Sequence, residues 1–129
     1  NWAKSIGGLP ALIARSEASL AAVKKWIGTT PFFCFLAQDP ATISNTSITL
    51  SITDKWFIGL NDKEKAVTTS QLIKRLEDEG VALDVASYRD APSGIRIWTG
   101  PTVETSDVVA LLPWLDWAYG EIAETGAFA

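Results

Sequence analysis

The strict alternation in residues 47–53, SITLSIT, constrains the fold of this chain more than any other feature. Ile48, Leu50 and Ile52 are apolar, and every residue beside them is serine or threonine. Because successive side chains of a strand point to opposite faces of a sheet, the pattern predicts a strand with one buried face. A sheet built from such strands needs a covering layer on its apolar side.

Two long stripes of apolar residues at helical spacing can supply that layer. The first predicts a helix with Pro10 in its first turn and Gly28 at its end. The second predicts a helix that begins near Thr105 or Ser106. The stripes consist of Leu9, Leu12 or Ile13, Leu20, Val23 and Ile27 in the first helix, and Val108, Leu112, Leu115, Tyr119 and Ile122 in the second.

Weaker patterns predict the remaining elements. The run FFCFLAQ (32–38) indicates a strand, and residues 54–66 are irregular and charged, which is typical of a loop. Thr68 and Gln71 have the spacing of a capping box and predict the start of a third helix, which Gly80 would end. The runs VALDVASYR (81–89) and GIRIWTG (94–100) are joined by DAPSG and predict a β-hairpin. We expect the tail TGAFA (125–129) to be loose.

The predicted order is helix, strand, strand, helix, strand, strand, helix. This order favours an α+β fold, a two-layer sandwich in which a small antiparallel sheet has helices packed on one face. A length of 129 residues with 47% hydrophobic and 20% charged residues is typical of one domain with its own core. The sequence contains no methionine, and we expect it to be a piece of a longer protein.

Composition excludes several classes of function. The net charge of −4, without a basic run, argues against nucleic acid or an anionic membrane as a partner. No apolar run approaches the roughly 18 to 20 residues of a membrane span, and no signal-peptide pattern opens the chain. The absence of histidine excludes a Ser-His-Asp triad, a Cys-His pair and a histidine metal site. Cys34, the only cysteine, is expected to be a small buried apolar residue rather than a catalytic thiol.

Arg96 is the residue hardest to explain as structure alone, because it stands inside the apolar run Ile95-Arg96-Ile97-Trp98. Alternation places Ile95 and Ile97 on one face of the strand and Arg96 with Trp98 on the other. The large aromatic suggests that this second face is at least partly covered, and a covered guanidinium needs an anion. The residues leave three interpretations open: an internal salt bridge, which is favoured, a ligand carboxylate, and an exposed charge. Arg89 is interpreted as solvated.

Three stretches carry a resemblance to a known family: WAKSIGGLPALIARSEASLAAVKKWI (2–27), SNTSITL (44–50) and GVALDVASYRDAPSGIRIWTGPTVETSDVVALLPWLDW (80–117). They resemble the C-terminal domain of phosphoserine aminotransferase, a class V, fold-type I enzyme that uses pyridoxal phosphate. The resemblance covers nearly the whole chain and is weakest at residues 54–68. The chain differs from many members in having Tyr88 where they have histidine, and its turn is one residue longer.

The resemblance implies a function and specific site residues. Members of the family transfer an amino group from glutamate to 3-phosphohydroxypyruvate. The products are 2-oxoglutarate and phosphoserine, and the reaction belongs to serine biosynthesis. It implies that Arg96 binds the substrate α-carboxylate and that Tyr88 and Arg89 help to bind the substrate phosphate. It further implies a cytoplasmic homodimer.

The same resemblance implies what residues 1–129 lack. The Schiff-base lysine and the rest of the cofactor site belong to a large domain that precedes this segment in the family. We therefore expect a single class V C-terminal domain that has no catalytic, cofactor-binding or metal-binding residue of its own. Alone it should bind no pyridoxal phosphate and should be inactive. Two alternatives remain: the C-terminal domain of another class V aminotransferase, and a free-standing regulatory domain that binds an amino acid on its sheet.

Overall fold

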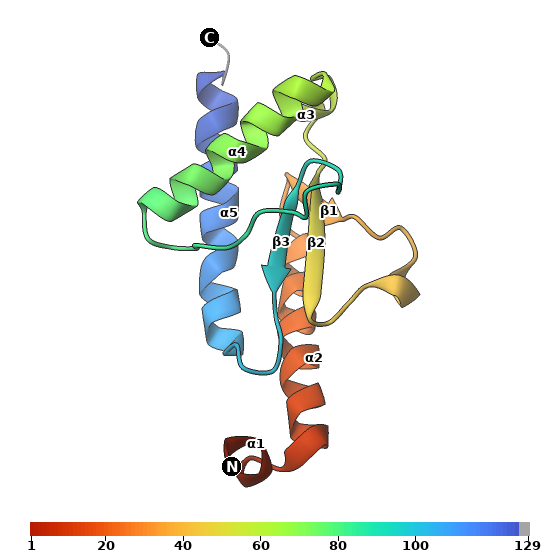
Figure 1. Ribbon diagram of the computed structural model, residues 1–129. Coiled ribbons are helices and arrows are strands. Elements are labelled where there is room, and N and C mark those ends of the chain that lie inside the picture. The colour runs from red at the N-terminus through yellow and green to blue at the C-terminus, as the bar shows by residue number, and fades with distance from the viewer. Residues whose placement is uncertain (127–129) are drawn as a thin grey trace.

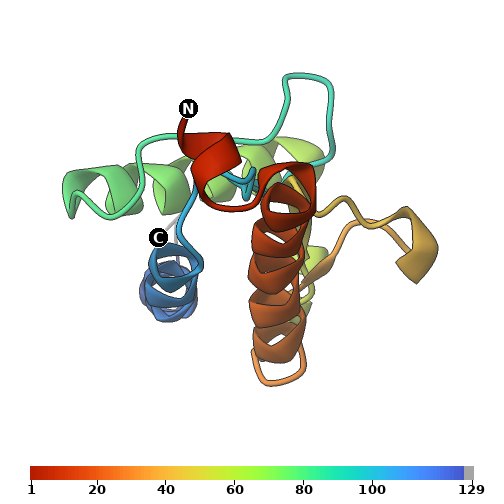
Figure 2. The ribbon, with the colours of Figure 1, turned by 90° about the horizontal axis from the view of Figure 1, so that it is seen from below.

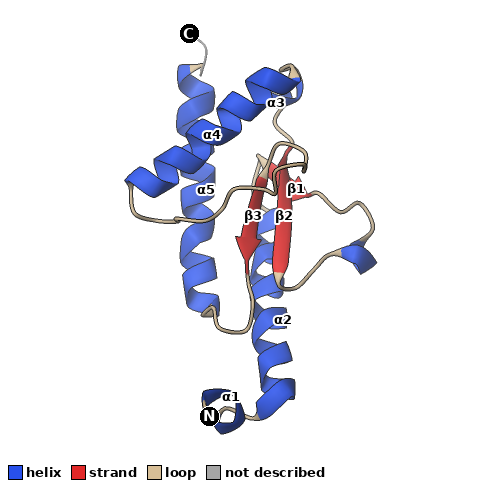
Figure 3. Ribbon diagram, in the orientation of Figure 1, coloured by secondary structure: helices blue, strands red, loops and turns tan. Residues whose placement is uncertain are grey.

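The computed structural model describes residues 1–126 and combines three strands with helices of very different lengths (Figures 1 and 3). The helices are α1 (Trp2–Ser5), α2 (Gly8–Ile27), α3 (Lys55–Ile58), α4 (Asp62–Asp78) and α5 (Thr105–Thr125), with a 3-10 turn at Pro40–Thr42. The strands are β1 (Phe33–Phe35), β2 (Ser47–Ile52) and β3 (Ile95–Trp98). Residues 127–129, the end of the tail that we expected to be loose, lie outside the described residues.

The sheet is antiparallel in the order β1-β2-β3, with β2 in the centre. Ile48 lies opposite Ile97 and Thr49 lies opposite Arg96, so apolar residues pair with apolar residues across the two strands. Every second residue of β2 is buried, beginning with Ile48, which confirms the strand predicted from the alternation. The α+β prediction is confirmed, with three strands in the sheet among the described residues where four were expected.

The helices α2 and α5 lie side by side behind the sheet and form the second layer (Figures 1 and 2). All five apolar residues of the α5 stripe are buried, as predicted. At the contact between the two helices the hydroxyls of Ser19 and Thr105 are 2.9 Å apart, and Ser19 is fully buried. Small side chains at this crossing allow the two helices to approach closely.

The first two turns of α2 depart from the predicted stripe. Leu9 is 67% exposed, Ile13 is also exposed, and the buried residues of the helix begin at Ser16. This part of α2 extends with α1 beyond the end of the sheet in Figure 1. The stripe was therefore correct as a helical pattern but wrong as a list of core residues.

Residues 54–66 are not a loop, contrary to the prediction from their charge. They form α3 and the first part of α4, which crosses the upper half of α5 (Figure 1). The capping box of α4 is Asn61 with Glu64, whose side chains bond each other's backbone N–H groups at 2.9 and 3.0 Å. The predicted cap, Thr68, instead lies buried inside the helix, where its hydroxyl donates to the carbonyl of Glu64.

The predicted hairpin forms only on one side. GIRIWTG contains β3, but VALDVASYR contributes a single bridge, between Ala86 and Ile95. Only Val85 of that run is fully buried, so a longer strand there would gain little apolar burial. After this bridge the chain turns back toward β2, and a Cβ on Gly94 would lie 2.2 Å from the carbonyl oxygen of Leu50. Glycine is therefore required where the turn enters β3.

Candidate functional site

The polar face of the sheet is the one that points away from α2 and α5, and we call it the outer face. Arg96 lies on this face, in the end strand β3, since its neighbours Ile95 and Ile97 are buried in the core behind it. The Arg96 side chain is nevertheless only 13% exposed. The segment from residue 81 to residue 94 crosses in front of the sheet here, on the side away from α2 (Figures 1 and 2).

Backbone contacts hold that segment against β3. The N–H of Arg96 donates to the carbonyl of Val85 at 2.9 Å, next to the bridge between Ala86 and Ile95. Asp84 and Tyr88 lie on this crossing segment, on either side of the bridge. Both side chains contact the Arg96 side chain.

The guanidinium of Arg96 is covered but only partly paired. The ring of Tyr88 lies over it, with 4.8 Å between the guanidinium carbon and the ring centroid. One nitrogen, Nη2, is 3.4 Å from a carboxylate oxygen of Asp84, which is long for a charge-assisted hydrogen bond. The Nε atom is buried and has no hydrogen-bond partner. A buried donor without a partner is costly, so the site is incomplete as an ion pair.

Trp98 shares the outer face with Arg96 and is half exposed. Its indole ring lies against the backbone of Gly100, where an added Cβ would be 2.2 Å from the ring. Gly100 thus lets the tryptophan lie flat beside the end of β3.

Sequence reasoning singled out Arg96, Tyr88 and Arg89, and the structure brings the first two together. Arg89 is exposed at the turn and makes no ion pair or hydrogen bond with the other described residues. Arg96 is therefore a covered arginine on β3, whereas Arg89 is an exposed arginine on the segment that crosses the sheet before β3. Sequence reasoning missed Asp84, whose contact with Arg96 depends on how the segment crosses the sheet.

This arrangement can bind an anion but has no group suited to bond making. Among residues 1–126, no group of three or more histidine, cysteine, aspartate or glutamate residues could hold a metal ion. Burial raises the pKa of the Cys34 thiol, which keeps it protonated and poorly nucleophilic. None of the lysines in the chain is buried, whereas a Schiff-base lysine needs a desolvated site that lowers its pKa. The pKa of Lys74 is instead raised, by its hydrogen bond to Asp78.

Two further polar contacts of the molecule join elements that are distant in sequence. Tyr119 is fully buried and donates to a carboxylate oxygen of Asp54 at 2.7 Å; burial, followed by this hydrogen bond, raises the pKa of the phenol. Arg15 donates to the carbonyl of Pro101 and pairs with Glu104. It ties α2 to the segment between β3 and α5.

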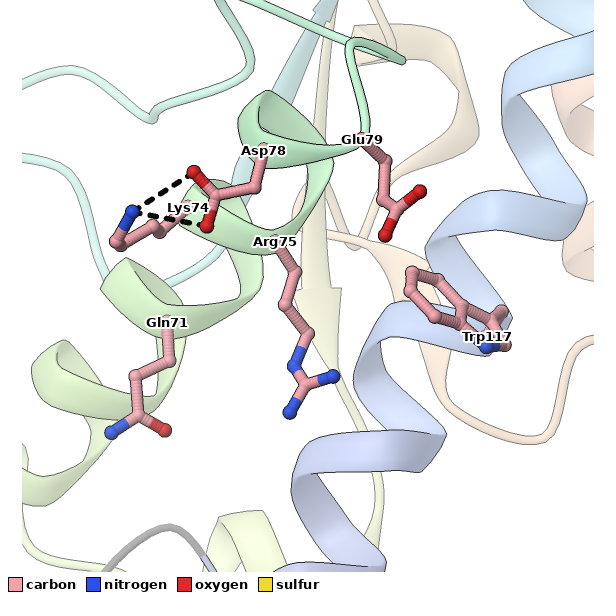
Figure 4. A pocket seen from close by; sticks show the side chains of 6 residues that line it. All are labelled: Gln71, Lys74, Arg75, Asp78, Glu79 and Trp117. Carbon is pink, nitrogen blue, oxygen red and sulfur yellow. Dashed lines mark hydrogen bonds and ion pairs between the residues drawn. The ribbon is translucent and has the colours of Figure 1, made fainter.

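A pocket between the end of α4 and the middle of α5 is lined mainly by charged side chains (Figure 4). Lys74 is bound to Asp78 within α4, and Arg75 is 3.8 Å from Glu121 of α5. Trp117 closes one side of the pocket next to Glu79. Its two basic residues each lie near a carboxylate and none of its charged side chains is buried, so this pocket lacks a covered arginine like that of the outer face.

The structure also bears on membrane association. Within residues 1–126, no helix combines the length and the apolar character required to cross a bilayer.

Comparison with known proteins gives two curated relatives, while no family model matches the chain. The phosphoserine aminotransferase of Methanosarcina barkeri is 42% identical over 118 residues, and that of Methanosarcina mazei is 40% identical over the same length. Both alignments cover 92% of this chain and 29% of the relative, so the chain spans under a third of the length of these proteins.

Solved structures agree in fold. The phosphoserine aminotransferase from Bacillus circulans subsp. alkalophilus superposes with a TM-score of 0.71 at 18% identity, over 93% of this chain and 30% of that one. A second phosphoserine aminotransferase structure, on radiation damage of the Schiff base, gives a TM-score of 0.72 at 16% identity. The resemblance seen in the sequence is therefore confirmed: nearly the whole chain is homologous to part of the phosphoserine aminotransferases.

Proposed function

We propose that this chain is the small, substrate-binding domain of a phosphoserine:2-oxoglutarate aminotransferase and that Arg96 binds the α-carboxylate of its substrates. The observation that carries the proposal is the incomplete pairing of Arg96. Its guanidinium is almost covered, its Nε has no partner, and its only carboxylate contact is 3.4 Å long. A substrate carboxylate would give the terminal nitrogens a closer acceptor than Asp84 does, and arginine suits this role because its planar donors match two carboxylate oxygens.

The position of Arg96 on a strand supports a role in orientation. Its backbone is fixed by pairing with Thr49 on one side and by the hydrogen bond to Val85 on the other. Tyr88 covers one face of the guanidinium and limits the positions it can adopt. A carboxylate held by such a rigid group would place the substrate α-carbon reproducibly, which lowers the barrier of the following reaction through orientation.

The substrate phosphate is assigned to Arg89, with Tyr88 beside it. Arg89 is exposed and has no anionic partner, so it can pair with a phosphate without first breaking an ion pair. Tyr88 connects the two groups in sequence and in space, because it precedes Arg89 and stacks on Arg96. The resemblance to the phosphoserine aminotransferases assigns the two arginines to the two anionic ends of phosphoserine, and the exposure of Arg89 is compatible with this assignment.

Pyridoxal phosphate would be held outside this segment. None of the lysines is buried, so they do not fit a Schiff-base site, which needs a desolvated amine. We place the cofactor in the longer protein, as part of a cytoplasmic homodimer that contains the large domain. The chain alone should show no transamination when it is mixed with phosphoserine, 2-oxoglutarate and pyridoxal phosphate.

The test is Arg96→Ala, with Arg96→Lys beside it, in the full-length protein. Losing charge-assisted hydrogen bonds to a carboxylate should lower kcat/KM roughly 10- to 200-fold. The loss should appear with both glutamate and phosphoserine, because each presents an α-carboxylate. Lysine should restore only part of the activity, because it cannot bind a carboxylate in bidentate fashion. Unchanged kinetics with both substrates would refute the role of Arg96.

Arg89→Ala separates the phosphate from the carboxylate. It should raise KM for phosphoserine much more than KM for glutamate, since only the former carries a phosphate. Equal losses would contradict a phosphate role. A full-length enzyme that transaminates other amino donors but not phosphoserine would instead identify a class V aminotransferase of different specificity.

A further inference from the structure

We propose that Asp84 is an internal competitor of the substrate, a carboxylate that occupies Arg96 in the empty site and is displaced when a substrate carboxylate binds. This inference rests on the proposed function of Arg96. In this proposal Asp84 does not bind the substrate; it lowers the affinity of Arg96 for the substrate carboxylate.

The contact between Asp84 and Arg96 has the geometry of a weak, exchangeable pair. A single oxygen of Asp84 approaches a single nitrogen, Nη2, at 3.4 Å. In the same molecule Glu104 approaches Arg15 at 2.8 Å. The Asp84 side chain is 80% exposed, so water can solvate it as soon as it leaves the arginine. Exposed carboxylates in ion pairs contribute little free energy, which makes displacement by a better ligand feasible.

The environment of Arg96 makes displacement necessary as well as feasible. Tyr88 occupies one face of the guanidinium, and Nε is buried. A ligand carboxylate must therefore use the terminal nitrogens, and Nη2 is the one that Asp84 contacts. Two carboxylates beside one guanidinium repel each other, so substrate and Asp84 exclude one another there.

Asp84 is the carboxylate that the described residues place beside Arg96 in the empty site. Asp84 neutralises Arg96 while no substrate is bound, and the cost appears as a weaker apparent affinity for substrate. The expected magnitude follows from the strength of exposed ion pairs. Removing the competitor should tighten carboxylate binding about 2- to 5-fold.

The experiment compares Asp84→Asn with Asp90→Asn in the full-length enzyme. Asparagine keeps the size of the side chain and removes its charge in both variants. Asp90 lies in the same crossing segment and makes no ion pair with the described residues, so it reports the general effect of removing one negative charge. KM and kcat are measured with glutamate and with phosphoserine, and melting temperatures establish that each variant is folded.

Asp84→Asn should lower KM about 2- to 5-fold for both substrates with little change in kcat, and Asp90→Asn should leave KM for glutamate nearly unchanged. In an Arg96→Ala background, Asp84→Asn should no longer lower KM, because no guanidinium remains to compete for. A raised KM in Asp84→Asn would mean that Asp84 positions Arg96, and equal effects of Asp84→Asn and Asp90→Asn would mean a general charge effect. Either outcome overturns the competition.

Failure of the wider proposal has a different signature. If Arg96→Ala leaves the kinetics with both substrates unchanged, the carboxylate role and the competition fail together. If Arg96→Ala impairs both substrates while Asp84→Asn changes neither KM, only the competition fails.

Discussion

The two faces of the small sheet are formed by the same strands but differ in how completely the polar groups near them are hydrogen-bonded. On the core face, Ile95 is fully buried, and the polar group that reaches into this core, the hydroxyl of Tyr119, has a 2.7 Å hydrogen bond to Asp54. On the outer face, Arg96 has a 3.4 Å contact and a buried Nε without a partner. The core face satisfies its groups within the chain, whereas the outer face leaves a cation whose pairing can be completed by a ligand.

The sharpest separation of the two faces comes from neighbouring residues of β2. Ile48→Ala removes a fully buried side chain and should lower the free energy of unfolding by about 3 kcal/mol, since it leaves a cavity in the core. Thr49→Ala changes the adjacent residue on the outer face and should cost under about 1 kcal/mol. Urea unfolding of both variants measures the difference. Similar losses would mean that the outer face is packed as firmly as the core.

The hydrogen bond between Tyr119 and Asp54 gives a smaller but more specific prediction. Tyr119→Phe keeps the ring against Phe32 and Phe33 and removes only the hydroxyl. We expect a loss of about 1 to 2 kcal/mol in the free energy of unfolding, because the variant loses a hydrogen bond to a carboxylate. Asp54→Asn is the matched control: it keeps an acceptor for the phenol and should cost less than Tyr119→Phe.

The same tyrosine predicts a dependence of stability on pH. Burial, and then the hydrogen bond to Asp54, raise the pKa of Tyr119 in the folded chain above its ordinary value of about 10. Above that pH the unfolded chain loses the phenolic proton while the folded chain keeps it, so stability falls as pH rises. The decline should approach about 1.4 kcal/mol per pH unit for this group. Unfolding curves between pH 9 and pH 11 should show a shallower decline for Tyr119→Phe, and parallel declines would contradict the pKa shift.

The core face was largely predictable from the sequence because apolar periodicity records burial directly. The alternation of β2 and the stripe of α5 correspond residue by residue to buried positions. The prediction failed where buried groups are polar. Thr68 is buried in α4 but satisfies its hydroxyl on the carbonyl of Glu64, so it carries no apolar signal. In α2, Leu9 follows the stripe but remains exposed, in the part of the helix that extends beyond the end of the sheet (Figure 1).

The outer face was predictable only in part. Arg96 shares its face of the strand with the large aromatic Trp98, which suggested a covered arginine and made Arg96 a candidate before its surroundings were known. The surroundings depend on how the segment before β3 crosses the sheet, and this crossing is fixed by a single bridge at Ala86 and by the glycine turn at Gly94. Local pattern predicted a regular hairpin instead. Asp84 therefore became visible only in the structure, where it contacts Arg96.

The smallest expected change in stability tests the contrast between the core face and the outer face most directly. Asp84→Ala should change the free energy of unfolding of the chain by less than about 0.5 kcal/mol, because its carboxylate is exposed and its contact with Arg96 is long. Asp54→Ala, which leaves the buried phenol of Tyr119 without its acceptor, should cost several times more. Urea unfolding at pH 7 with both variants gives the comparison. If Asp84→Ala were as destabilising as Asp54→Ala, the pair on the outer face would be structural, and Arg96 could not exchange Asp84 for a substrate carboxylate at low cost.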